Sequence, residues 1–107
     1  EIDCASFAAS GDESVSTNRY IDDAHFFIQK DIWGQDILVF QIEANAFLWK
    51  MVRTLTGTLI NLDKSNAPEN SMKKILEAKD RTKAGVTAPP TGLFLYQIKF
   101  DGIRRHV

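Results

Sequence analysis

The sequence has a single cysteine, Cys4, so no disulfide bond can form within the chain. One unpaired cysteine is typical of a reducing compartment, and we expect a cytoplasmic protein. No apolar run approaches the ~18 residues that a transmembrane helix needs, and no secretory signal with an apolar core is present. The apolar share of 44% and the charged share of 25% are those of ordinary globular proteins. These features predict a soluble protein without a membrane span.

Motifs for metals and nucleotide phosphates are also missing. His25 and His106 have no cysteine partners and no His-x-x-x-His spacing, which argues against a zinc site. No Gly-x-x-x-x-Gly-Lys loop is present for a nucleotide. Cys4 has no base near it in the sequence and is expected to be a small buried apolar residue. Asp22 and Asp23 would point to opposite faces of a strand, so we interpret them as turn residues.

Basic residues are scarce in the first part of the chain and concentrated in the middle. Residues 1–43 carry nine acidic and two basic residues, whereas residues 44–83 carry four acidic and eight basic residues. A basic segment can face phosphate, although a solvated helix surface gives the same pattern. With 107 residues the chain is predicted to form one domain. Because it begins at Glu1 and not at Met, we expect it to be part of a longer protein.

The strongest helical pattern covers residues 46–63. Asn45 is a suitable N-cap, because its side-chain oxygen can accept a hydrogen bond from a free amide of the first turn. Apolar residues recur at helical spacing and define one broad face. These residues are Phe47, Leu48, Met51, Val52, Leu55, Leu59 and Leu62.

Arg53 and Gly57 lie roughly opposite this apolar face, one turn apart. A glycine inside a helix costs about 1 kcal/mol relative to alanine, and close approach of another backbone or a substrate is the usual reason for it. A solvated arginine next to an incidental glycine would show the same spacing. The helix is therefore expected to fill a core with one face and to present a cation beside a gap on the other.

Before this helix the pattern is mainly that of strands. Residues 5–9 predict one or two helical turns anchored by Phe7, and residues 15–33 are β-like. Gly34 predicts a two-residue hairpin turn within residues 33–36. The strand 36–44 follows, with alternating apolar residues.

After the central helix, Asn66 and Glu69 resemble a capping box that opens a second helix, which ends near Asp80 and Arg81. Residues 85–92 are rich in proline and glycine and are predicted not to be helical.

Alternation returns in residues 93–100, which are predicted to pair with strand 36–44, and residues 103–107 form a basic tail. The predicted fold class is α+β, with a mostly antiparallel sheet backed by two helices.

Two stretches resemble the C-terminal part of the tRNA pseudouridine synthase A family. The first is Ala44-Asn45-Ala46-Phe47-Leu48-Trp49-Lys50-Met51-Val52-Arg53, with Gly57 one turn later. The second comprises Asp80-Arg81, Ala84-Gly85, Thr87-Ala88-Pro89 and Gly92-Leu93-Phe94-Leu95. Ser16-Thr17-x-Arg19 is similar to a weaker third motif. The resemblance covers residues 2–100 and implies a pseudouridine-synthase-like half domain, the C-terminal domain of a longer enzyme.

The family isomerises uridine in the anticodon stem-loop of tRNA, by breaking the glycosidic bond and rejoining ribose to C5 of uracil. It uses one aspartate and no metal or organic cofactor, and its members are homodimers. That aspartate belongs to an Arg-x-Asp-x-Gly-Val type of motif in the N-terminal half, which this chain lacks. The resemblance therefore implies that the isolated chain is inactive.

By the same resemblance, Arg53 corresponds to the basic residue that pairs with the catalytic aspartate. Leu93 corresponds to an apolar residue near the target base, although ordinary core packing also explains it. Residues 61–66 depart from the family, whose members often close the central helix with glycines. The candidates for RNA contacts are Arg19, Asn45, Lys50, Arg81 and Thr87.

An alternative interpretation is a non-catalytic α+β interaction domain that dimerises through an exposed helix face. Without the resemblance, the residues support no more than an α+β domain with a basic helix face.

Overall fold

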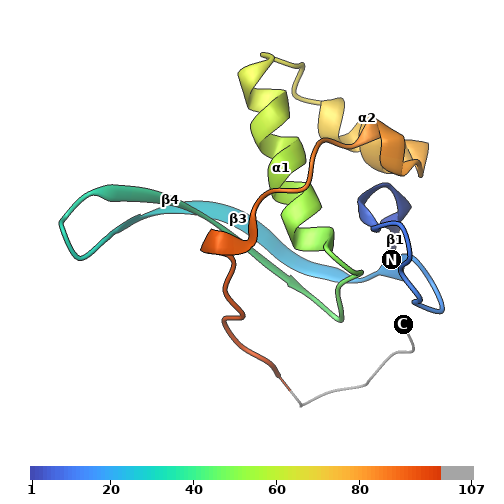
Figure 1. Cartoon of the computed structure of the whole chain (residues 1–107), viewed down its shortest axis with the longest axis horizontal. Helices are drawn as coiled ribbons and strands as arrows, with labels where there is room; N and C mark the ends of the chain where they lie inside the picture. Colours follow the sequence, from blue (N-terminus) through green and yellow to red (C-terminus); the bar gives the residue numbers. More distant parts are fainter. Residues whose placement is uncertain (100–107) are drawn as a thin grey trace.

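The computed structural model describes residues 1–99, which have the predicted α+β arrangement (Figure 1). Among these residues no helix is long and apolar enough to cross a membrane. Three short 3₁₀ turns accompany the regular elements: η1 (Ala5–Phe7), η2 (Arg81–Lys83) and η3 (Pro90–Gly92). The strands and helices are β1 (Ile2–Asp3), β2 (Asn18–Arg19), β3 (Ile21–Lys30), β4 (Asp36–Ala44), α1 (Met51–Lys64) and α2 (Ser71–Ala78).

Strands β3 and β4 form a long antiparallel hairpin, and α1 crosses it in Figure 1. The predicted strand 36–44 is confirmed at both ends. The turn is longer than predicted, because it spans residues 31–35. The Asp31 carboxylate accepts hydrogen bonds from the backbone N–H groups of Trp33 (2.8 Å) and Gln35 (2.9 Å). Gly34 adopts a left-handed φ of +77° there, which glycine tolerates without strain.

The interpretation of Asp22 and Asp23 as turn residues is wrong, because both belong to β3. Ile21 pairs with Ala44 and Asp23 pairs with Glu43, so the register shifts between them. A bulge places an extra residue on one strand. The irregularity at Asp22 and Asp23 is therefore a bulge within β3, and the chain does not turn there.

The buried core lies where η1 meets α1 and α2. Phe7 is 1% exposed, which confirms that it anchors the N-terminal turn, and Cys4 is buried as predicted. Burial raises the pKa of the Cys4 thiol, and the nearby charge of Arg19 opposes this effect. Leu48 and Met51 complete the buried set. The partly buried apolar residues packed against it are Ala8, Ile21, Leu55, Met72, Ile75, Leu76 and Ala84.

Helix α1 begins at Met51, so the predicted start at residue 46 is wrong. Asn45 is not its N-cap. The Asn45 side chain instead accepts a hydrogen bond from the Tyr20 N–H (2.9 Å), and its own N–H donates to the Tyr20 carbonyl (3.1 Å). Lys50 occupies the N-cap position with a left-handed φ of +59°. Pairing with the end of the hairpin therefore delays the start of the helix.

Asn66 ends α1 and does not open α2. It has a φ of +52°, and its N–H donates to the Asp63 carbonyl (3.1 Å). The Ala67 N–H donates to the Leu62 carbonyl (3.0 Å), which completes the paired hydrogen bonds of a Schellman motif. The second helix exists as predicted but is shorter, running from Ser71 to Ala78.

The predicted last strand is not formed over residues 93–99, and Phe100 lies outside the described residues. The described strands therefore make two two-stranded sheets, β1–β2 and β3–β4, and not one larger sheet. Phe94 and Tyr96 are each 82% exposed, so the alternating apolar residues have no surface to cover. Pro90–Gly92 forms a 3₁₀ turn within the loop that was predicted not to be helical. The basic tail at residues 103–107, with His106, also lies outside the described residues.

One buried hydroxyl connects η1 to the C-terminal end of α2. Ser6 Oγ donates to the Ile75 carbonyl (2.7 Å) and accepts from the Asp80 N–H (2.9 Å), and Ser6 is fully buried. Replacing Ser6 by alanine is expected to lower the free energy of unfolding by about 1–3 kcal/mol, because two backbone groups lose their partner. Urea denaturation of the chain measures this, with the exposed Ser10→Ala as control. Equal midpoints for both variants would contradict it.

Candidate functional site

The face of α1 that carries Arg53 and Gly57 is covered by residues 85–88, an extended segment (Figure 1). The Ala88 N–H donates to the Arg53 carbonyl (3.0 Å), and the Gly85 N–H donates to Thr58 Oγ1 (2.8 Å). The hydroxyls of Thr54 and Thr87 are hydrogen-bonded to each other at 3.2 Å. The polar residues of this helix face thus hold a second chain segment along the helix.

Gly57 allows this contact. A Cβ atom at position 57 would lie 1.8 Å from the Val86 carbonyl oxygen and 3.1 Å from the Ala88 nitrogen. The prediction that Gly57 marks the close approach of another backbone is confirmed. The covering segment also needs a glycine at position 85, because a Cβ there would lie 3.0 Å from the Cα of Thr58 on α1.

The Arg53 side chain is fixed at one nitrogen. Its Nε donates to the Ala88 carbonyl (2.9 Å), and the side chain is half-buried. Neither Nη nitrogen has a hydrogen bond to a residue within the part of the chain that the structure describes. A guanidinium anchored in this way can present two parallel donors to a carboxylate or phosphate.

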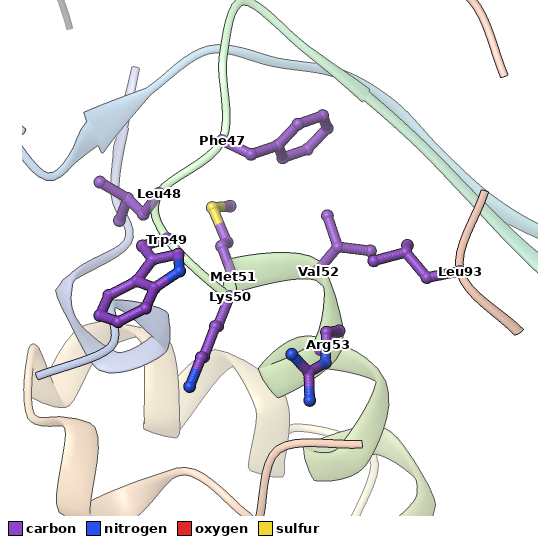
Figure 2. Close-up of a pocket in the computed structure, with 8 residues that line it drawn as sticks. All are labelled: Phe47, Leu48, Trp49, Lys50, Met51, Val52, Arg53 and Leu93. Atoms are coloured by element: carbon purple, nitrogen blue, oxygen red, sulfur yellow. The ribbon is translucent and has the colours of Figure 1, made fainter. Parts of the chain in front are cut away.

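A pocket of about 280 Å³ lies beside the first turn of α1. Figure 2 shows Leu93, from the C-terminal segment, lying beside Val52. The nitrogens of Lys50 and Arg53 point to the same side of the turn in that view. The structure therefore brings Arg53, Lys50 and Leu93 together at one pocket. The lining residues are Phe47, Leu48, Trp49, Lys50, Met51, Val52, Arg53 and Leu93.

Arg81 and Thr87 lie together farther along the same segment. Arg81 Nη2 donates to Thr87 Oγ1 at 3.4 Å, a long hydrogen bond. Asp80 caps η2 by accepting from the Thr82 side chain and N–H, and these hydrogen bonds lower the pKa of the Asp80 carboxyl. Neither Arg81 nor Thr87 lines the pocket. They form a separate position on the loop that follows α2.

Arg19 and Asn45, also predicted to contact RNA, are hydrogen-bonded to the backbone of the chain. Arg19 is 1% exposed, and its Nη1 donates to the carbonyls of Ser16 (2.7 Å) and Asn18 (2.6 Å). A phosphate cannot reach this guanidinium in the described structure, so we assign Arg19 a structural role. Asn45 is exposed, but its side-chain oxygen is used by the Tyr20 N–H.

The described residues form no metal site of the usual kind. Among residues 1–99, no three His, Cys, Asp or Glu side chains come close enough to hold an ion. His25 Nδ1 lies 2.7 Å from Asp23 Oδ2 on the exposed surface of the hairpin. This pair lies on β3 and contributes nothing to the pocket lining.

Sequence reasoning missed Asp12. Its Oδ2 accepts a hydrogen bond from the Trp49 N–H (2.5 Å), and the Trp49 carbonyl accepts one from the Ala9 N–H (3.2 Å). The loop before β2 therefore holds the turn that precedes α1. The partners are 37 residues apart, and no spacing rule in the sequence connects them.

Hydrogen bonds from Ser14 and from the Trp49 N–H lower the pKa of Asp12. A lowered pKa means that the ionised carboxylate stabilises the fold. This contribution is complete above the unfolded pKa of about 3.9 and is lost as the pH falls through the lower folded pKa. In a Trp33→Phe background, acid titration below about pH 4 should change the Trp49 fluorescence. Asp12→Asn should remove this titration, and an unchanged profile would refute the role of Asp12.

Residues 1–101 match the family model described as tRNA pseudouridine synthase. A protein of Treponema denticola named tRNA pseudouridine synthase A is 54% identical over 100 residues, which are 94% of this chain and 35% of that protein. Proteins of the same name from Thermoanaerobacter sp. (strain X514) and Leuconostoc mesenteroides are 44% and 37% identical. They match 90% and 94% of this chain, and 37% and 38% of their own lengths. The chain thus spans little more than a third of these relatives.

Proposed function

Because the chain belongs to the tRNA pseudouridine synthase family, we propose that it is the C-terminal domain of an enzyme that converts uridine to pseudouridine in tRNA. The reaction breaks the glycosidic bond to N1 of uracil and forms a bond from the same ribose carbon to C5, while C5 loses its proton and N1 gains one. This chain contributes one wall of the active cleft. The nucleophilic aspartate comes from the part of the full-length protein outside this chain.

The way in which Arg53 is held supports this proposal most. Its Nε is fixed to Ala88, and its Nη nitrogens have no partner within residues 1–99. We infer that they pair with the catalytic aspartate, because a guanidinium keeps a carboxylate ionised and oriented where water is scarce. Leu93, 47% exposed at the pocket, would pack against the target base.

Contacts with tRNA are assigned to residues near the pocket and on the loop after α2. Lys50 is exposed beside the pocket, and Asn45 lies at the end of the hairpin. Arg81 and Thr87 form the second position. Phosphate contacts of this kind orient the RNA without reading its sequence. The anticodon stem-loop as target, a homodimer of the full-length protein and a cytoplasmic location complete the proposal, and these three points rest on the family resemblance.

The test compares the full-length protein with the isolated chain of residues 1–107. We expect the full-length protein to form pseudouridine in a tRNA transcript and the isolated chain to form none, because it lacks the nucleophile. Liquid chromatography of nucleosides from digested tRNA measures both. Pseudouridine formed by the isolated chain would refute the division of the active site.

Salt dependence separates this function from that of a non-catalytic interaction domain. Each neutralised phosphate of a single-stranded RNA contributes a slope of about −0.7 to the logarithm of affinity against the logarithm of salt concentration. We expect the affinity of the full-length protein for tRNA to fall steeply between about 50 and 200 mM salt, because proteins that neutralise several phosphates of a nucleic acid lose affinity in this range. Absence of tRNA binding even at low salt would favour the interaction domain.

A further inference from the structure

Trp49 exposes its indole at the rim of the pocket beside α1. The residue is 55% exposed although it lines the pocket with Phe47 and Arg53 (Figure 2). A large aromatic side chain and two cations therefore line the same pocket. The proposed function gives roles to Arg53, Leu93 and Lys50 at this pocket but none to Trp49.

The backbone of Trp49 is held on both sides. Its N–H donates to Asp12 and its carbonyl accepts from Ala9. Gly11, with a φ of +90°, lies next to the ring, where a Cβ would make an ordinary van der Waals contact of 3.6 Å with Cζ3 of the indole. A ring on a fixed backbone loses little conformational entropy when a ligand stacks on it. The backbone that carries the exposed indole is thus held in place.

Two cations line the same pocket as the indole, while the carboxylate of Asp12 is hydrogen-bonded to the Trp49 backbone N–H. Lys50 Nζ lies over one face of the Trp49 ring, 4.7 Å from its centre, in a cation–π contact, and Arg53 lines the same pocket. A base would therefore stack on the opposite face of the ring or displace the Lys50 ammonium. Aromatic rings bordered by cations are how proteins bind unpaired nucleotides, because the base stacks on the ring and the phosphate meets the cation. A nucleobase has a flat, apolar face that can stack on the exposed indole.

We propose that Trp49 is a stacking platform for one unpaired nucleobase of the RNA, and that Lys50 contacts the phosphate of that nucleotide. This inference rests on the proposed function, because it takes tRNA as the ligand. Stacking next to Arg53 would place the neighbour of the target uridine and thereby affect which uridines react. Trp49 is in this view a residue of substrate positioning and specificity.

The test uses the full-length protein and a tRNA transcript, with binding measured by filter retention. Trp49→Leu keeps apolar bulk and removes the aromatic ring, whereas Trp49→Phe keeps an aromatic ring. We expect Trp49→Leu to weaken tRNA binding about 5- to 150-fold, the range found when a stacking residue is removed. Trp49→Phe should restore most of the affinity. Trp33, exposed on the hairpin turn, offers the matched control Trp33→Leu, which should bind like the wild type.

The outcomes distinguish this inference from the proposed function. Equal losses for Trp49→Leu and Trp49→Phe would overturn stacking and indicate that the rest of the protein packs on this ring. Wild-type activity with unchanged binding by Trp49→Leu would also overturn the inference and leave the proposed reaction intact. Binding that depends on an aromatic ring at position 49, in a wild type that forms no pseudouridine, would retain the platform and refute the reaction. A wild type that binds no tRNA would overturn both.

Discussion

Replacing Arg53 by alanine in the full-length protein is expected to lower the rate of pseudouridine formation by about 100-fold or more, while most tRNA binding persists. Misplacing an active-site group has effects of this size. Nε of Arg53 is fixed to the Ala88 carbonyl, and no residue within 1–99 uses its Nη nitrogens. The guanidinium would therefore be lost from the aspartate with which we propose it pairs. Single-turnover rates at saturating enzyme measure the chemical step.

Two variants make this experiment specific. Arg53→Lys keeps the charge and loses the forked donors, so its rate should lie well below wild type and above that of Arg53→Ala. Lys74→Ala removes an exposed cation from α2 and should leave the rate unchanged. Thermal denaturation shows whether each variant folds. A folded Arg53→Ala enzyme with wild-type rate would mean that Arg53 is only structural, and the site assignment would be withdrawn.

Replacing Gly57 by alanine is expected to destabilise the protein by about 3 kcal/mol, although alanine is the better helix former by about 1 kcal/mol. The new Cβ would lie 1.8 Å from the Val86 carbonyl oxygen, which is a backbone atom and cannot rotate away. Residues 85–88 would have to move off the helix. This would break the hydrogen bonds to Arg53 and Thr58, each worth about 1 kcal/mol.

Urea denaturation of the chain measures this loss, and Gly92→Ala is the control. A Cβ at position 92 meets no atom within 4 Å, so that variant should stay within about 0.5 kcal/mol of wild type. Because the segment also anchors Nε of Arg53, Gly57→Ala should lower the activity of the full-length protein. An alanine variant as stable as the wild type would show that the two segments are not in close contact.

Strand 36–44 and the contact at Gly57 were predictable because both follow from local rules. Alternation defines a strand, and a costly mid-helix glycine requires a steric reason. The start of α1 was not predictable in this way. Asn45 has the right side chain for a cap, but the end of the hairpin is close enough to use that side chain for Tyr20. The register of a neighbouring strand thus overrode a local preference.

Arg19 and Asp12 have contacts that the sequence does not predict: Arg19 is buried, and the partner of Asp12 is 37 residues away. A basic residue after a polar stretch is usually exposed, but here Arg19 is 1% exposed and its Nη1 donates to two backbone carbonyls of its own segment. Residues 93–99 alternate like a strand without forming one in the described structure. A strand needs a partner edge and a surface to cover, and the pattern alone supplies neither.

The hydrogen bonds of Ser6 have a consequence for the order of events during translation. The β3–β4 hairpin needs only neighbouring residues, so it can form as soon as it leaves the ribosome. The partners of Ser6 at Ile75 and Asp80 are 69 and 74 residues later in the chain. Phe7 and Cys4 can pack on Leu48 and Met51 earlier, but the hydroxyl of Ser6 finds its partners only after α2 has been synthesised. The N-terminal turn therefore completes its packing late, and until then part of the apolar surface that α2 covers stays exposed on the nascent chain.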